Sequence, residues 1–182
     1  NRINLTYEIE ESDVAEVSKI IILGNKSFSV SKIKSIMKIK EKTLLRFLSS
    51  ADRYDPDKLE YDKQLITEFY NNNGYPDFTF TSSIAQLSLN SNDFEIILNI
   101  NEGNKFNFGD INVTSELKKL NAEVIANALP IKSMDTYNAS IIKEAVKDIK
   151  NLAEQNGYSF IEINPVLDKD IDNNNISVNI IL

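Results

Sequence analysis

Residues 54–78 read YDPDKLEYDKQLITEFYNNNGYPDF, and residues 137–161 read YNASIIKEAVKDIKNLAEQNGYSFI. The two segments align without a gap. In each, a helical pattern stops at a glycine that is followed by a tyrosine, at Gly74-Tyr75 and Gly157-Tyr158. The tyrosines lie 158 − 75 = 83 residues apart, about the length of a small domain. Chance similarity between helices would not keep register through a helix, a turn and a strand. The sequence therefore predicts an internal duplication.

The strands that flank these helices are duplicated as well. At an offset of 176 − 94 = 82, the alternating residues Phe94, Ile96, Leu98 and Ile100 fall on Ile176, Val178, Ile180 and Leu182. At an offset of 108 − 17 = 91, the apolar run VSKIIILGN at residues 17–25 falls on the segment around residues 108–113. Each copy then reads strand, helix, helix, strand, strand. The first copy carries about 91 − 83 = 8 extra residues, which we place in KEKTLLRFLSSADR at 40–53.

The helix ends follow from local chemistry. Asp55 can accept hydrogen bonds from the free amides of a first helical turn, and Pro56 fits the first helical position. Gly74 can adopt the left-handed conformation on which helices commonly stop, so we interpret the Gly-Tyr pairs as helix ends. A shorter helix is predicted over residues 29–39, with Ile33, Ile36 and Met37 on one face.

Composition argues against catalysis. The chain of 182 residues has no cysteine and no histidine, which excludes thiol–imidazole pairs, disulfides and ordinary zinc clusters. It carries 20 basic and 27 acidic residues, and this excess of negative charge disfavours nucleic acid and anionic membranes as partners. DKDIDNNN at 168–175 resembles the start of a calcium loop but lacks its glycine and its last glutamate, so we predict a hairpin turn. We expect no catalytic, cofactor-binding or metal-binding residue.

Together these motifs resemble a known family. IIILGN at 20–25, the segment at 54–78 and NINEG at 99–103 are similar to the POTRA (polypeptide-transport-associated) domain. Within that family the chain resembles the end of the second, the third and the fourth domain of the BamA family, alphaproteobacterial type. Residues 1–12 would be the last strand of a preceding unit, 13–103 the third-like domain and 104–182 the fourth-like domain. The second copy departs from the pattern at Ser115-Glu116, where Gly-Asn would stand.

The resemblance implies an α+β fold. Each β-α-α-β-β unit would have a three-stranded mixed sheet covered on one face by two helices. It also implies a non-enzymatic, periplasmic role as part of an outer-membrane protein. The implied partners are unfolded outer-membrane β-barrel precursors, accessory lipoproteins of the assembly machinery and a C-terminal membrane β-barrel of the same chain. The alternatives are a POTRA-type scaffold of another secretion or cell-division complex and an enzyme with a carboxylate-based site.

Two segments are candidate partner-binding sites. The second strand of a POTRA unit lies at the sheet edge, where another chain can add a strand. In the first copy it is FTFTSSIAQLSL at 78–89, whose alternation changes phase, so we expect a β-bulge near Ser82–Ala85. The candidate edge residues are Phe78, Phe80, Ser82, Ile84, Ala85 and Leu87. The matching strand at 160–170 contains Pro165, which interrupts pairing. Binding is thus expected on the first copy, the alternative being that both edges are inert.

The second candidate is the insert. Leu45 and Phe47 belong to an apolar group, residues 44–48, that is unfavourable to expose. These side chains either fold back on their own domain or form a docking patch for a neighbouring unit or an accessory protein.

Overall fold

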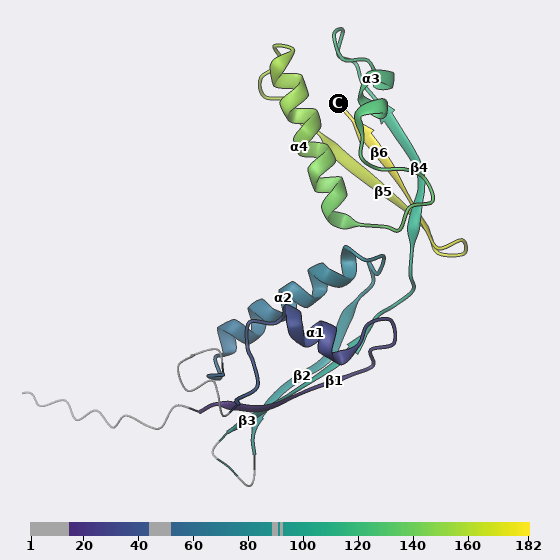
Figure 1. Cartoon of the computed structure of the whole chain (residues 1–182). Coiled ribbons are helices and arrows are strands. Elements are labelled where there is room, and N and C mark those ends of the chain that lie inside the picture. Colours follow the sequence, from purple (N-terminus) through teal and green to yellow (C-terminus); the bar gives the residue numbers. More distant parts are fainter. Residues whose placement is uncertain (1–14, 44–51, 89–90, 92) are drawn as a thin grey trace, which may run out of the picture.

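The computed structural model describes residues 15–43, 52–88, 91 and 93–182, and within them two units repeat one order of elements (Figure 1). The first unit consists of β1 (Val17–Leu23), α1 (Val30–Ile36), α2 (Pro56–Asn71), β2 (Thr79–Leu87) and β3 (Phe94–Asn101). The second consists of β4 (Asn107–Thr114), α3 (Ala122–Ala128), α4 (Ala139–Gln155), β5 (Asn164–Asp170) and β6 (Asn175–Ile181). The predicted order of strands and helices is confirmed in both copies.

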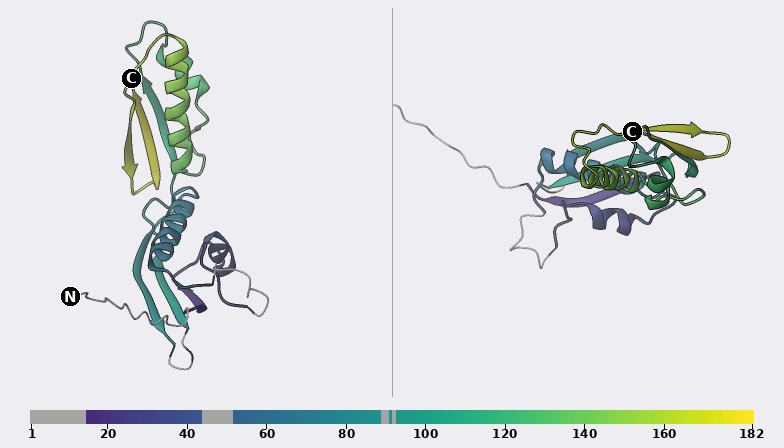
Figure 2. Two further views of the ribbon diagram at one scale, coloured as in Figure 1. Left: turned by 90° about the vertical axis from the view of Figure 1, so that its left-hand side faces the viewer. Right: turned by 90° about the horizontal axis from the view of Figure 1, so that it is seen from above.

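Each unit has its own three-stranded mixed sheet. The strand orders are β1-β3-β2 and β4-β6-β5, so the third strand of each unit is central. The first strand pairs with it in parallel and the second in antiparallel orientation. Two helices cover one face of each sheet, and the units lie end to end (Figures 1 and 2). The predicted α+β fold and the edge position of the second strand are confirmed.

The two long helices begin and end by the same local chemistry. Asp55 accepts from the amides of Asp57 and Lys58 at the start of α2, and Asn138 does the same for α4. At the other end Gly74 has φ +96° and Gly157 has φ +87°, conformations that cost glycine no Cβ clash. Tyr75 and Tyr158 then donate their backbone N–H back to the last helical turn. Both predicted helix ends are confirmed.

Two separate cores hold the units together. In the first, Ile66 and Tyr70 of α2 belong to the same buried cluster as Ile96 and Leu98 of β3. In the second, α4 contributes buried residues such as Ile149, and β6 contributes Val178 and Ile180. Burying side chains of this size stabilises each unit by about 1.5–3 kcal/mol per residue. The helices of one unit therefore do not complete the core of the other.

Several predicted bounds and phases need correction. The second strand of the second unit begins at Asn164 rather than at residue 160, since Phe160 has φ +67°, a left-handed conformation that a strand cannot contain. The bulge in β2 lies between Phe80 and Ser82, just before the predicted place. Ile84 therefore pairs with Ile97 and points away from the face of Phe80, whereas Ala85 packs on the core.

The junction between the units is made of backbone and polar contacts. Phe106 donates its N–H to the carbonyl of Gly74 at 2.7 Å, and Ser140, in the first turn of α4, donates its N–H to Asn72 Oδ1 at 2.9 Å. Lys169 of β5 pairs with Asp77, just before β2. A Cβ on Gly74 would lie 2.9 Å from Thr136 and 3.2 Å from the Phe106 carbonyl. Gly74 therefore has a second role: it lets the units approach each other.

Candidate functional site

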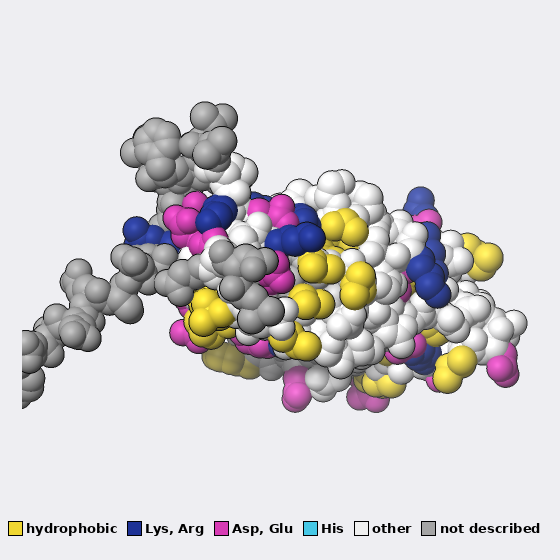
Figure 3. Space-filling model, turned by 90° about the horizontal axis from the view of Figure 1, so that it is seen from below, with side chains coloured by type: hydrophobic (Ala, Val, Ile, Leu, Met, Phe, Trp, Pro, Cys, Tyr) yellow, Lys and Arg dark blue, Asp and Glu magenta, His cyan; other side chains and the backbone are white. Residues whose placement is uncertain are grey.

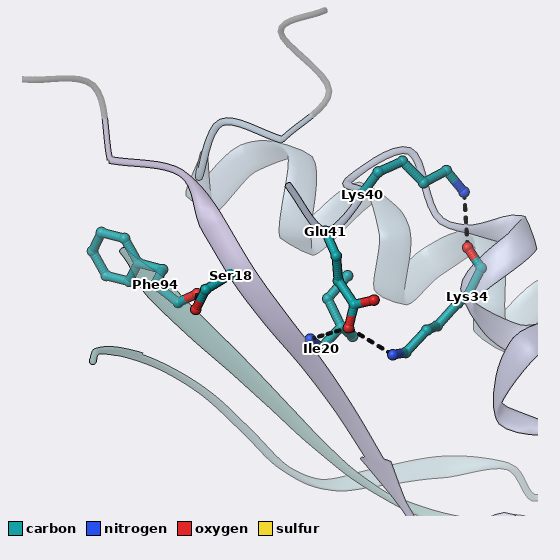
Figure 4. A network of polar contacts seen from close by, with 6 residues as sticks. All are labelled: Ser18, Ile20, Lys34, Lys40, Glu41 and Phe94. Atoms are coloured by element: carbon teal, nitrogen blue, oxygen red, sulfur yellow. Dashed lines mark hydrogen bonds and ion pairs between the residues drawn. The ribbon is translucent and has the colours of Figure 1, made fainter. Parts of the chain in front are cut away.

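The outer edge of β1 is closed by the segment that follows α1. Lys42 donates its N–H to the Val17 carbonyl at 2.8 Å, and Val17 donates its own N–H to the Asp52 carbonyl at 2.6 Å. Further along, the Ile20 N–H donates to Glu41 Oε1 at 2.8 Å (Figure 4). These bonds occupy backbone groups that a bare edge strand would offer to another chain.

Glu41 is held in place for this task. Lys34 Nζ lies 2.7 Å from the same carboxylate oxygen, as Figure 4 shows. Burial alone would raise the pKa of Glu41, but the hydrogen bonds from Lys34 and Ile20 outweigh it and leave this pKa below its usual value. At neutral pH the carboxylate is therefore ionised and can accept both bonds. On the inner side of β1, Ser18 Oγ donates to the Phe94 carbonyl at 3.1 Å.

The outer edge of β2 is different. Its inner side pairs with β3 from Thr79 to Leu87, and no second strand lies against its outer side within the described residues. The strand, TFTSSIAQL, contains no proline and no charged residue, which are the usual devices that block an edge. Among the described strands of the first unit, β2 is thus the one whose outer backbone groups remain available.

The predicted edge residues do not share one environment: some lie on one face of the sheet, some on the other, and Phe78 lies just before β2. Phe78 is buried and stacks on Tyr70 with ring centroids 4.2 Å apart, so it is a core residue just before the strand. Phe80 and Ala85 pack against the same core, and Ser82 Oγ accepts from Asn99 Nδ2. Ile84 and Leu87 are about half exposed, at 47% and 54%. Hydrophobic side chains gather on the underside of the molecule in Figure 3.

A groove runs beside β2. The flank of α2 lines it from Glu60 to Asn72, together with Phe80 of β2 and with Ala139 and Lys143 of α4. Its volume is about 420 Å³. Lys63 lies over the Phe80 ring, 5.8 Å from the centroid, and pairs with Glu60 at 2.7 Å. We call this space the junction groove because both units contribute to its wall.

The edges of the second unit are less accessible to a partner strand. Thr136 bridges to Asn107 of β4, and Phe108 exchanges backbone hydrogen bonds with residues 134 and 135, which closes part of the outer edge of β4. The edge strand β5 has Pro165, which cannot donate, and ends in the charged residues Asp168, Lys169 and Asp170. Next to it lies the predicted hairpin turn, which is confirmed: Asp170 accepts from Asn173 at the tip.

A polar network at the end of the first unit was not predicted from the sequence. Glu102, only 6% exposed, accepts from the backbone N–H of Lys26 at 2.9 Å, from Ser27 Oγ at 2.7 Å and from Tyr70 OH at 2.9 Å. Tyr75 OH in turn donates to Ser27 Oγ at 2.7 Å. The network ties the loop after β1 to the end of β3. The sequence feature that could have indicated this network is Glu102-Gly103, an acidic residue beside a glycine at the end of an apolar strand.

Asp62 is a second residue whose role the sequence left open. It is fully buried in α2 and accepts from the backbone N–H groups of Lys38 and Ile39, at 2.5 and 2.9 Å, just after α1. Burial raises the pKa of Asp62 despite these two hydrogen bonds. Its position on the core face of the helix is therefore structural: it anchors the segment that leads to the closed edge of β1.

Other features limit the chemistry of the described residues. They contain no group of three or more acidic side chains placed to hold a metal ion. No helix among them is long and apolar enough to cross a bilayer. The candidate insert residues Leu45 and Phe47 lie outside the described part of the chain, as do residues 1–12.

Comparison with known proteins agrees with this geometry. The POTRA family, described as a surface antigen variable number repeat, matches residues 15–103 and 106–182. Outer membrane protein assembly factor BamA of Neorickettsia risticii (strain Illinois) is 23% identical over 165 residues, and the alignment covers 91% of this chain and 22% of the relative. BamA of Neisseria meningitidis serogroup B (strain ATCC BAA-335 / MC58) is 24% identical over 163 residues, 90% of this chain and 20% of the relative. The chain thus spans about a fifth of these relatives.

A solved structure shares the fold. The crystal structure of Haemophilus influenzae BamA POTRA3-5 aligns with a TM-score of 0.71 at 24% identity, covering 92% of this chain and 65% of that chain.

Proposed function

The chain belongs to the POTRA family, and on this premise we propose that it is a periplasmic docking module of an outer-membrane β-barrel assembly factor of the BamA kind. Its units would be the third and fourth POTRA domains of an alphaproteobacterial-type protein, at 13–103 and 104–182, with 1–12 as the last strand of the unit before. Its partners would be unfolded β-barrel precursors and accessory lipoproteins, and a membrane β-barrel would follow in the same chain. No step requires catalysis.

The proposed mode of binding is strand addition to β2. The observation that carries it is the contrast between the two edges of the first sheet. Glu41 and Lys42 occupy the edge of β1, whereas no described residue covers the edge of β2 in this way. An added strand would gain backbone hydrogen bonds whatever its sequence. The side chains at every second position of that strand would contact this unit and give a weak preference for particular client sequences. This suits clients that share β-strands rather than a sequence motif.

The expected affinity is modest. A strand of nine residues presents alternate residues outward, so about four or five of them can exchange backbone bonds with a partner. Each bond contributes about 0.5–1.5 kcal/mol, while ordering each residue of an unfolded client costs about 1–2 kcal/mol. Side-chain contacts with exposed apolar groups such as Ile84 and Leu87 must supply the remainder. Binding that is this closely balanced permits a client to be released.

An amide-shift titration tests the proposal. The probe is a peptide of about 12 residues copied from a transmembrane strand of a bacterial outer-membrane β-barrel. We expect shifts concentrated along residues 78–89. Equal or larger shifts along residues 160–167 would refute the assignment to the first unit, and no shifts in either segment would refute strand addition altogether.

Two modified peptides serve as matched controls. Each keeps every side chain but carries N-methyl groups on alternate residues, one on the odd and one on the even positions. Only one of the two patterns removes the donors that face β2. Strand addition therefore predicts that one peptide loses its effect and the other retains it, whereas binding through side chains alone predicts equal behaviour.

The insert is a second proposed docking place, for an accessory lipoprotein or a neighbouring unit. Replacing Leu45 and Phe47 with serine should leave the melting temperature unchanged and abolish binding of that partner. A lower melting temperature would instead show that these side chains complete the core of the first unit.

A further inference from the structure

The junction groove is lined by Phe80 of β2 and crosses from one unit to the other. β2 begins at Thr79, shortly after Gly74 and Asp77, which contact the second unit. A strand paired with β2 and extended past Thr79 therefore reaches the junction between the two units (Figure 1). The groove at this junction is lined by Phe80 and Asn71 of the first unit and by Ala139 and Lys143 of the second.

One wall of the groove holds a buried acceptor without a donor. Asn71 Oδ1 is inaccessible to solvent and has no hydrogen-bond partner in the described part of the chain. Buried polar atoms are normally paired, because an unsatisfied group loses its hydration without compensation. The neighbouring Asn72 shows the contrast, since its Oδ1 accepts from the Ser140 N–H at 2.9 Å. Because Asn71 lines the groove, a turn of its side chain would bring this unpaired oxygen within reach of a donor on a bound chain.

The second unit adds an unpaired charge to the same space. Lys143 is exposed on α4 and, among the described residues, forms no hydrogen bond or ion pair. Lys63, by contrast, is already paired with Glu60. Lys143 can therefore meet a carboxylate or a carbonyl of a bound chain.

We propose that an extended peptide added to β2 continues into the junction groove, donates a backbone N–H to Asn71 Oδ1 and accepts from Lys143, so that the second unit completes the binding site. This inference rests on the proposed strand addition. It goes further because it builds the binding site from both units. The groove has its shape only when the two units keep the relative orientation that the junction contacts maintain. A ligand that contacts both walls binds this orientation best, and by linkage it stabilises that orientation.

The first test replaces the acceptor. Asn71→Ala removes an unsatisfied oxygen, so the free protein should keep or gain thermal stability, while affinity for the β-strand peptide should fall about two- to tenfold, the value of one hydrogen bond. Glu154→Ala is the control, because it alters the repeat-equivalent position in the second unit (71 + 83 = 154), which lies near the C-terminal end of α4 and does not line the groove. Unchanged affinity of Asn71→Ala would overturn the proposed contact.

The second test addresses the contribution of the second unit. Lys143→Ala should lower the affinity, and Lys147→Ala, an exposed lysine one turn further along α4 that does not line the groove, should leave it unchanged. In the titration of the unaltered chain, shifts should appear at residues 139–143 as well as along β2. Shifts along β2 without any at 139–143 would overturn this inference and leave strand addition intact. No shifts along β2 would overturn both.

Orientation can be measured directly. The chain has no cysteine, so Asp57→Cys and Lys150→Cys together place one spin label on each unit. The peptide should narrow the distribution of label–label distances, and the Asn71→Ala background should reduce the narrowing. A distribution that the saturating peptide leaves unchanged would contradict the coupling.

Discussion

The two helix-ending glycines provide a matched pair of perturbations. Gly74 and Gly157 occupy equivalent positions and have nearly the same backbone angle, φ +96° and +87°. They differ in what surrounds them: a Cβ on Gly74 would meet Thr136 at 2.9 Å, Lys105 at 3.0 Å and the Phe106 carbonyl at 3.2 Å, whereas a Cβ on Gly157 would have no neighbour within 4 Å. Replacement of each by alanine therefore separates backbone strain from packing between the units.

The shared part of the cost is conformational. Alanine in the left-handed region costs about 1–2 kcal/mol, partly offset by about 0.4–1 kcal/mol from the smaller entropy of the unfolded chain. Gly157→Ala should therefore destabilise its unit by about 1 kcal/mol. Gly74→Ala carries the same cost plus about 1–3 kcal/mol for overpacking against atoms that include a backbone carbonyl. We expect about 2–4 kcal/mol in total, unless the units shift apart.

The assay is urea unfolding followed by the amide signals of each unit separately. A stability loss that is larger for Gly74→Ala supports the reasoning. So does a similar loss accompanied by new chemical shifts at Lys105, Phe106 and Thr136, because the strain is then relieved by movement of the second unit. Equal losses with unchanged signals at these three residues would refute the close approach of the units at Gly74.

Three further predictions concern the polar contacts. Burial alone would raise the pKa of Glu102, but the hydrogen bonds from Lys26, Ser27 and Tyr70 lower it, so its contribution to stability is complete at neutral pH and is lost as the pH falls through that lowered pKa. Glu102→Gln should thus lower the free energy of unfolding by about 2–4 kcal/mol at pH 7. In melts recorded between about pH 5 and pH 3, the stability of this variant should depend less on pH than that of the unaltered chain. Glu41→Ala should free the Ile20 N–H and promote self-association through β1, which sedimentation velocity would detect. Lys34→Ala keeps the Glu41 bond to Ile20, so this control variant should sediment like the unaltered chain. A Glu41→Ala variant that stays monomeric would contradict the closure of this edge. Asp62→Ala should cost about 2–4 kcal/mol and speed amide exchange at Lys38 and Ile39, and slow exchange there would show that another acceptor replaces the carboxylate.

Local and periodic features of the fold could be predicted from the sequence. The offset of 83 residues identified the duplication, and Asp55-Pro56 and Gly74 marked the bounds of α2, because caps depend on residues within one helical turn of each other. The phase change in β2 likewise required a bulge. Its position was missed by a residue or two, since alternation alone does not show which neighbour carries the extra residue.

The candidate site depends on contacts between residues that are distant in the sequence. Glu41 closes the edge of β1 by meeting Ile20, 21 positions away, and Glu102 meets Lys26 across 76 positions. No pattern identifies the partner of either carboxylate, since a carboxylate has the same local signature on an exposed surface and in a buried network. The sequence by itself determined the two units and their elements, and the family resemblance placed the second strand at the edge. Only the tertiary structure decided which edge stays open and how the units meet, because hydrogen bonds and close approaches form between whichever groups the packed cores bring together.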